Sequence, residues 1–398
     1  MVRADDPALT AVRGLAAFWV FVYHAWVWAV PQRLWLPVGN GALDLTPLAS
    51  AGWAGVDVFY VLSGFLLWGM VDDWAMRRRD DLRLARFAER RALRILPPYY
   101  AQVALLALLG LVTTAVEAPT PTTLALNLTM THGLSLEHFQ AVNGVWWTLS
   151  IEAQFYVMLP LLAWAVRRAG WSAVLAAGVA TMLAWRLAAF DAFRDAPVIQ
   201  RIWILEQLPG RIDQFLLGMF ASHVARSAGE RASRWRDAVA RNAALRCALV
   251  LTGPFVLIAL AYRLHIGDFF LRYWQGHPWL YAWHLAAGAA IAVSLHAVAV
   301  RPNATSPPRR IAARVAVAFG VTSYSFYLWH EIVLRWFSAW VKGRFGEASI
   351  AAFAVNFTLG LALSLLVAAC WYRLFERPFL TVRSRLRAQP AAGTTSRA

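Results

Sequence analysis

An arginine and a histidine lie inside the first apolar segment of the chain. Arg13 and His24 have ten residues between them in a stretch that is otherwise apolar enough to enter a bilayer. An ionised side chain in a membrane costs roughly 2.5–3.5 kcal/mol, so such residues usually face a polar interior or a substrate pathway. On a helix the two residues lie about 16 Å apart along the axis, too far for direct contact. This spacing suits a site in which the arginine holds an anionic group and the histidine does chemistry deeper in the membrane.

Each of these two residues also has a structural interpretation. Histidine takes and gives a proton near neutrality, as a base acting on a hydroxyl must. A lone membrane histidine more often only hydrogen-bonds a neighbouring helix, but Arg13 on the same helix favours a functional role for His24. Arginine offers a planar fork of donors for phosphate or carboxylate. The alternative for Arg13 is snorkelling to the interface near the start of the helix.

More charged groups lie at predicted membrane depth, where each is costly unless paired. Asp57 is expected to pair with an arginine or to orient a histidine. Arg211 and Asp213 are expected to pair with Glu152 or Asp57. With His330, which lies in a later apolar segment, Asp57, Arg211 and Asp213 form a predicted supporting polar network. We interpret Ser63–Gly64 as a site of close helix approach.

A basic cluster precedes the third apolar segment. It contains Arg91 and Arg94 and ends at Pro97–Pro98. One interpretation is an interfacial helix held by anionic lipid. The other is a cationic seat for the phosphates of a cytosolic donor.

The composition is that of a polytopic membrane protein. Of 398 residues 60% are hydrophobic and 21 are Trp, against about 45–50% apolar residues in soluble domains. Apolar runs near 20 residues long predict an all-α fold with about ten transmembrane helices. The predicted spans lie near 10–30, 53–72, 98–117, 147–166, 172–190, 211–226, 247–263, 279–300, 312–340 and 350–372.

Arginine sets the predicted orientation. The loops after the second, fourth, sixth, eighth and tenth spans are rich in arginine and the intervening loops are poor in it. This pattern predicts both termini in the cytoplasm and excludes nucleic-acid binding as the reason for the net charge of +16. The polar tail 381–398 is predicted to be disordered. No metal site is expected, because the two cysteines, Cys247 and Cys370, lie in apolar runs as predicted buried thiols.

Three local features are less regular. The ninth span is long for one plain helix, and a break or tilt is expected near Ser323–Ser325. The segment 118–146 is partly polar and contains an apolar stretch that suggests a re-entrant piece. Trp146 and Trp147 fit an interfacial aromatic belt.

Taken in order, these segments resemble the acyltransferase-3 family of integral-membrane acyltransferases. The matching pieces are Arg13 with His24 and the segments 55–65, 90–97, 146–152, 211–218, 324–330 and 375–378. Outside this resemblance, the segment 375–378 is interpreted as a helix cap and anchor. The resemblance implies one transmembrane domain over residues 8–380.

The resemblance also implies site roles. His24 becomes the leading catalytic group, as base or transient acyl carrier, with Arg13 holding the donor or stabilising charge. Arg91 and Arg94 match positions expected to meet the coenzyme, and Glu152 matches the acidic residue of the Trp-rich segment. The implied donor substrate is acetyl-CoA or another acyl-CoA, and no bound cofactor is expected.

The predicted function is therefore membrane O-acyl transfer to a hydroxyl of a cell-surface or exported glycan, in a bacterial inner (plasma) membrane. The sequence shows no hydrolase-like domain after the last span, which favours a lipid-linked or exported saccharide as acceptor. Two alternatives stay open: a glycan or lipid transporter, and an acyltransferase for a small macrolide-type acceptor. Internal charges on many spans also suit a transporter, but the two halves show no evident pair of broken helices.

Overall fold

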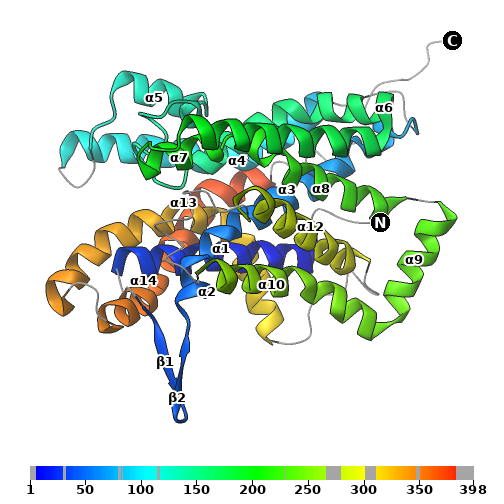
Figure 1. Ribbon diagram of the computed structural model, residues 1–398. Helices are drawn as coiled ribbons and strands as arrows, with labels where there is room; N and C mark the ends of the chain where they lie inside the picture. Colours follow the sequence, from blue (N-terminus) through cyan, green and yellow to red (C-terminus); the bar gives the residue numbers. More distant parts are fainter. Residues whose placement is uncertain are drawn as a thin grey trace.

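The computed structural model describes residues 6–29, 33–78, 82, 84–113, 117–227, 229–265, 279–300, 311–346 and 350–381. Within these ranges the chain is a helical bundle with one short hairpin (Figure 1). Each of the ten predicted apolar segments falls on a helix. The long helices are α1 (Pro7–Ala29), α3 (Gly55–Ala75), α4 (Leu84–Val112), α6 (Trp147–Ala192), α8 (Leu208–Arg226), α10 (Ala243–His265), α12 (Trp279–Ala299), α13 (Ile311–Phe345) and α14 (Ile350–Trp371).

Shorter elements fill the connections. They are α2 (Thr46–Ser50), η1 (Gly52–Ala54), α5 (Pro121–Leu128), η2 (His132–Leu134), α7 (Val198–Leu205), α9 (Glu230–Arg241) and η3, a π-helical turn (Tyr372–Glu376). In the described part of the chain, seven helices are long and apolar enough to cross a membrane, namely α1, η1 with α3, α4, α6, α10, α13 and α14 with η3. The protein is thus an all-α membrane protein in class, and α8 is the most polar of its long helices because it carries Arg211, Asp213, His223 and Arg226.

The 46-residue helix α6 covers two of the predicted spans, 147–166 and 172–190. Gly170 interrupts it with φ 79° and ψ 171°, a backbone conformation that glycine adopts without steric cost. Residues 147–169 and 171–192 therefore form two helical segments joined without an intervening loop. Arg167 and Arg168 lie directly before this kink, as the sequence pattern required of a basic turn.

Helix α3 occupies the middle of the bundle and packs against α1, α6, α8 and α12. Figure 1 shows α4, α5, α6 and α7 on one side of α3 and α8, with α1, α10 and α14 on the other. The backbones of α3 and α8 come very close, because a Cβ on Gly64 would meet the Phe215 carbonyl and one on Gly218 would meet the Val61 carbonyl. Gly64 thus has the packing role expected from its small size.

A β-hairpin follows α1, and the sequence analysis missed it. Strands β1 (Trp35–Val38) and β2 (Gly41–Asp44) pair antiparallel and project from the bundle (Figure 1). Each strand has only four residues and its side chains are almost all exposed, so neither strand carries the alternation of a half-buried strand.

Three further expectations need correction or stay open. Helix α13 runs without a break through Ser323–Ser325. The Ser323 hydroxyl donates to the Gly320 carbonyl, and the Ser325 hydroxyl donates to the Glu376 carboxylate. Cys247 and Cys370 are free thiols but are exposed on the helix surfaces instead of buried. The segment 118–146 forms α5, η2 and turns, and the tail from residue 382 lies outside the described residues.

Candidate functional site

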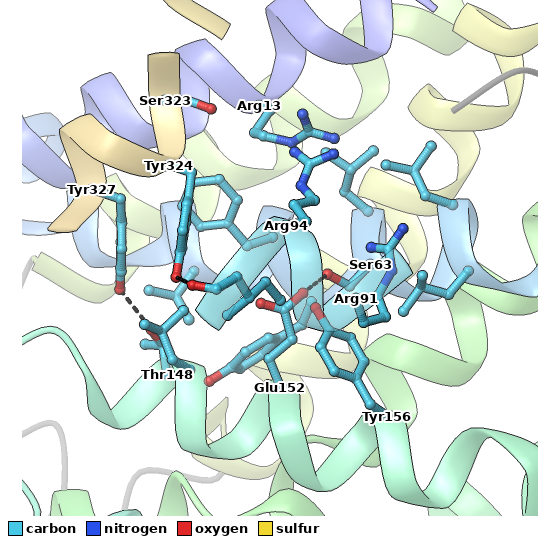
Figure 2. Close-up of a pocket in the computed structure, with 18 residues that line it drawn as sticks. Arg13, Ser63, Arg91, Arg94, Thr148, Glu152, Tyr156, Ser323, Tyr324 and Tyr327 are labelled. Carbon is cyan, nitrogen blue, oxygen red and sulfur yellow. Dashed lines mark hydrogen bonds between the residues drawn. The ribbon is translucent and has the colours of Figure 1, made fainter. Parts of the chain in front are cut away.

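Arg13 opens into a cavity of about 100 Å³, here called the arginine cavity (Figure 2). Five long helices line it: α1, α3, α4, α6 and α13. Its polar side chains are Arg13, Tyr60, Ser63, Arg91, Arg94, Thr148, Glu152, Tyr156, Ser323, Tyr324 and Tyr327. The structure therefore brings together the two arginines of the basic cluster before the third apolar segment, the arginine of the first segment and the acidic residue of the Trp-rich segment.

Positive charge exceeds negative charge in the arginine cavity. Its lining contains three arginines and a single carboxylate, Glu152, which accepts a hydrogen bond of 2.6 Å from the Ser63 hydroxyl. The Nε atom of Arg91 is buried without a hydrogen-bond partner in the described part of the chain. Ser63 thus orients a carboxylate, in addition to any packing role, and the cavity is suited to an anionic ligand.

A second carboxylate approaches this cavity from the far end of the chain. Glu376, at the end of η3, is 2% exposed and accepts a hydrogen bond of 2.7 Å from Ser325 on α13. It interacts electrostatically with Arg13 and Arg94. The residue interpreted from sequence as part of a helix cap is therefore a buried link between the chain terminus and the arginines.

His24 opens into a different cavity, of about 280 Å³, here called the histidine cavity. It is bounded by α1, η1, the start of α3, α7, α8, α13, the loop 140–145 and the first residue of α6. Its wall is largely aromatic and aliphatic, with His24, Gln140, Glu206, Arg211 and Glu331 as the polar members; the other ring-bearing members are Tyr23, Trp28, Trp53, Trp147 and Tyr327. Arg13 and His24 thus face separate cavities, in keeping with their separation along α1.

A chain of hydrogen bonds fixes the ring of His24. The Nδ1 atom of His330 lies 2.9 Å from the Tyr327 carbonyl oxygen, so this nitrogen carries the proton and donates it. Its Nε2 atom is then an acceptor, and it lies 3.2 Å from Nδ1 of His24. His24 Nδ1 also lies 3.0 Å from the Val20 carbonyl, so this nitrogen is the donor. In the neutral ring, the Nε2 atom of His24 then has a free lone pair, which is the form a base requires.

A buried ion network borders the histidine cavity. The Arg211 guanidinium pairs with Asp57 at 2.9 Å and also with Glu206, and His284 contacts Asp57. Burial raises the pKa of the Glu206 carboxyl, and the Arg211 charge acts in the opposite direction. Of the pairs expected from sequence, Arg211 forms the one with Asp57 and not the one with Glu152.

Asp213 lies apart from this pairing. Its carboxylate is buried, and the backbone N–H of Gln214 donates a hydrogen bond to it. Its nearest charges are Arg186 and Arg211. It lines neither of the two cavities, so the structure gives it a place in the core of α8 and no direct access to a ligand.

The two cavities have a common wall. Val56 of α3 and Tyr327 of α13 line both of them. The Tyr327 hydroxyl lies 2.9 Å from the Thr148 hydroxyl, which donates to the Val145 carbonyl at 2.9 Å. A single layer of side chains therefore separates the arginine cavity from the histidine cavity.

The neighbouring tryptophans differ from the expected aromatic belt. Trp146 is 1% exposed and donates a hydrogen bond of 2.9 Å to Gln102. Trp147 lines the histidine cavity. Trp146 thus packs in the core and Trp147 lines a cavity.

Comparison with known proteins identifies the family. The family model described as "Acyltransferase domain" matches residues 6–373, nearly the whole chain. The chain belongs to this acyltransferase family. It is therefore a membrane enzyme that transfers acyl groups other than aminoacyl groups, and no solved structure matches it.

Relatives with curated names are similar over most of their length. Acyltransferase MdmB of Streptomyces mycarofaciens is 25% identical, over 96% of this chain and 93% of the relative. Nodulation protein 10 of Rhizobium leguminosarum bv. viciae is 26% identical, over 77% and 95%. Exopolysaccharide production protein ExoZ of Rhizobium meliloti is 29% identical, over 87% and 95%.

Several residues in or beside the two cavities were not predicted from the sequence. They are Glu206, Tyr327, Glu331 and Glu376. The signal available for Glu206, Glu331 and Glu376 was the cost of a carboxylate in or beside an apolar segment. Tyr327 carried no comparable signal, because a tyrosine in a span is equally at home in the core.

Proposed function

We propose that this acyltransferase moves an acetyl group from cytosolic acetyl-CoA to a hydroxyl of a cell-surface or exported glycan. The observation that carries the proposal is the division of α1 between two cavities: Arg13 faces the cationic one and His24 the aromatic one. A phosphate-bearing donor needs cationic groups around it, whereas a largely neutral sugar acceptor needs aromatic and apolar walls with a few polar groups.

The arginine cavity is the proposed donor site. Arg91 and Arg94 meet the coenzyme phosphates, and Arg13 holds the donor nearer the reacting thioester. We extend the proposal to ten spans within a domain of residues 8–380, with both termini, including the tail 381–398, in the cytoplasm. The arginine-rich loops support this orientation. The inner membrane of a bacterium is the proposed location.

The proposed reaction breaks the carbon–sulfur bond of the thioester and forms a carbon–oxygen bond to the acceptor. His24 Nε2 takes the hydroxyl proton, the oxygen attacks the acyl carbonyl, and the proton passes to the leaving sulfur of the coenzyme. A cation or hydrogen-bond donor close to His24 stabilises the oxyanion. Arg13 holds the donor in the arginine cavity, where Ser63 orients Glu152. His24 is either the base for direct transfer or a transient carrier of the acyl group.

The acceptor class is supported by the names of the relatives. ExoZ is named for exopolysaccharide production, and its similarity extends over nearly the whole of both proteins. The aromatic wall of the histidine cavity suits the apolar faces of a sugar ring.

Transfer of radiolabel from acetyl-CoA tests the proposal. Membranes that contain the wild-type protein should label a glycan fraction, and membranes that contain His24→Ala at the same folded level should not. Absence of label with folded wild-type protein would contradict acetyl-CoA as donor. Movement of glycan in proteoliposomes without any acyl donor would favour a transporter instead.

A further inference from the structure

Two buried polar atoms of the histidine cavity have no hydrogen-bond partner in the described residues. They are Oε2 of Glu331, on α13, and Nε1 of Trp28, on α1. One is an acceptor and the other a donor. Leaving a buried polar group unpaired costs about 1–3 kcal/mol, so two such atoms on one cavity wall point to a ligand that pairs with both.

The rest of the Glu331 side chain is held in place. The residue is 4% exposed, and its carboxylate accepts a hydrogen bond from the backbone at Gly144. A Cβ on Gly144 would lie 3.4 Å from this carboxylate, so the loop backbone packs directly on it. Arg335, one turn farther along α13, interacts electrostatically with it. One oxygen is therefore anchored and the other is left for a ligand.

The position of Glu331 links it to His24. It follows His330, whose ring contacts His24 with 5.0 Å between ring centroids. The carboxylate and the His24 ring line the same cavity from two helices that pack against each other. A ligand whose reacting hydroxyl meets His24 therefore presents neighbouring atoms to Glu331.

We propose that Glu331 and Trp28 are the acceptor-binding residues of this enzyme and take a polyhydroxylated ring, a saccharide. Oε2 of Glu331 accepts a hydrogen bond from a hydroxyl adjacent to the one that His24 deprotonates, and Trp28 Nε1 donates to an oxygen of the same ring. Hydroxyls both donate and accept, so neighbouring hydroxyls satisfy both atoms. The inference rests on the proposed function and adds the residues that select the acceptor.

Octyl glucoside, octyl galactoside and octyl mannoside serve as probes, with the protein purified in nanodiscs and supplied with labelled acetyl-CoA. Glu331→Gln keeps the side-chain shape and removes the charge. We expect it to raise the KM for the best glycoside about 10- to 100-fold, since hydrogen bonds to charged groups are the strong ones. The KM for acetyl-CoA should stay unchanged. Trp28→Phe should raise the acceptor KM less, because it keeps the ring and loses only one neutral donor.

Monodeoxy versions of that glycoside locate the hydroxyl. The deoxy probe that lacks the hydroxyl bound by Glu331 should lose turnover with wild-type protein and lose little more with Glu331→Gln, as a double-mutant cycle requires. Trp340→Phe, at an exposed position of the same helix, is the control and should leave both KM values unchanged.

The outcomes separate this inference from the function on which it rests. An unchanged acceptor KM in Glu331→Gln, or a changed acetyl-CoA KM, would overturn the role of Glu331 and leave the enzyme function intact. Label transfer to native membrane material but to none of the three glycosides would overturn the saccharide class. No consumption of acetyl-CoA by the folded wild type would instead contradict the proposed function itself.

Discussion

The arginine cavity and the histidine cavity differ in how their charges are balanced. The first gathers Arg13, Arg91 and Arg94 around one lining carboxylate. Among the described residues that line the second, Arg211 is the one cation, and it is already paired with Asp57 and Glu206. A site with spare positive charge is prepared for an anionic ligand, and a site whose cation is already neutralised is prepared for a neutral one. The contrast supports the proposed division of donor and acceptor between the two cavities along α1.

The largest expected effect comes from the histidine cavity. His24→Ala should lower the rate of acyl transfer by about 10²–10⁴, the usual contribution of a positioned base, while acetyl-CoA still binds. Transfer assays and equilibrium binding of the coenzyme measure the two quantities. His296→Gln is the control, because His296 lies on α12 and bonds Trp235 outside both cavities. If His24→Ala transferred acyl groups at the wild-type rate, the catalytic role of His24 and the proposed difference between the two cavities would be contradicted.

The ion network gives the next effect, on stability instead of catalysis. Arg211→Met leaves Asp57 and Glu206 buried without their cation, which should cost about 3–5 kcal/mol of unfolding free energy. Thermal denaturation in nanodiscs measures it. Arg194→Met removes an exposed pair with Asp191 and should cost at most about 1 kcal/mol. Equal losses of unfolding free energy in the two variants would show that Asp57 and Glu206 do not depend on the Arg211 charge for stability.

Substitutions in the arginine cavity should change only the kinetic parameters for the donor. Arg94→Ala should raise the KM for acetyl-CoA about 10- to 100-fold, the loss of a charge-assisted hydrogen bond to phosphate. The acceptor KM should not change. Arg241→Ala removes an equal charge from the exposed end of α9 and serves as the control. A rise in the acceptor KM would contradict the separation of the two cavities.

The smallest expected effect concerns the orientation of Glu152. Ser63→Ala removes one hydrogen bond to this carboxylate, worth about 1 kcal/mol, so the donor KM should rise about fivefold. Thr358→Val is matched, since the Thr358 hydroxyl bonds only its own helix on an exposed face of α14. If the two variants had the same KM for the donor, Ser63 would have only a packing role.

Local sequence properties predicted the helices, and long-range packing decided the site. Apolar length placed every predicted segment on a helix, because a span must satisfy its own backbone. Because a charged side chain is costly in a membrane, Arg13, His24 and Asp57 could be predicted as candidate site residues from the sequence. Which partner each charge meets depends on which helices pack together, so Arg211 could be matched to Asp57 only in the structure. Short irregular pieces such as the hairpin at 35–44 carry no such periodic signal.

The thin wall formed by Val56 and Tyr327 has an electrical consequence. If the arginine cavity opens to the cytoplasm and the histidine cavity to the other side of the membrane, water in each cavity carries that side's potential up to this wall. Most of the transmembrane voltage then falls across a single layer of side chains. Moving one elementary charge through 100 mV is worth about 2.3 kcal/mol. An uncharged acetyl group crosses that layer without electrical work, whereas the proton that follows it from His24 to the sulfur does not, so the membrane voltage would bear on the proton step alone.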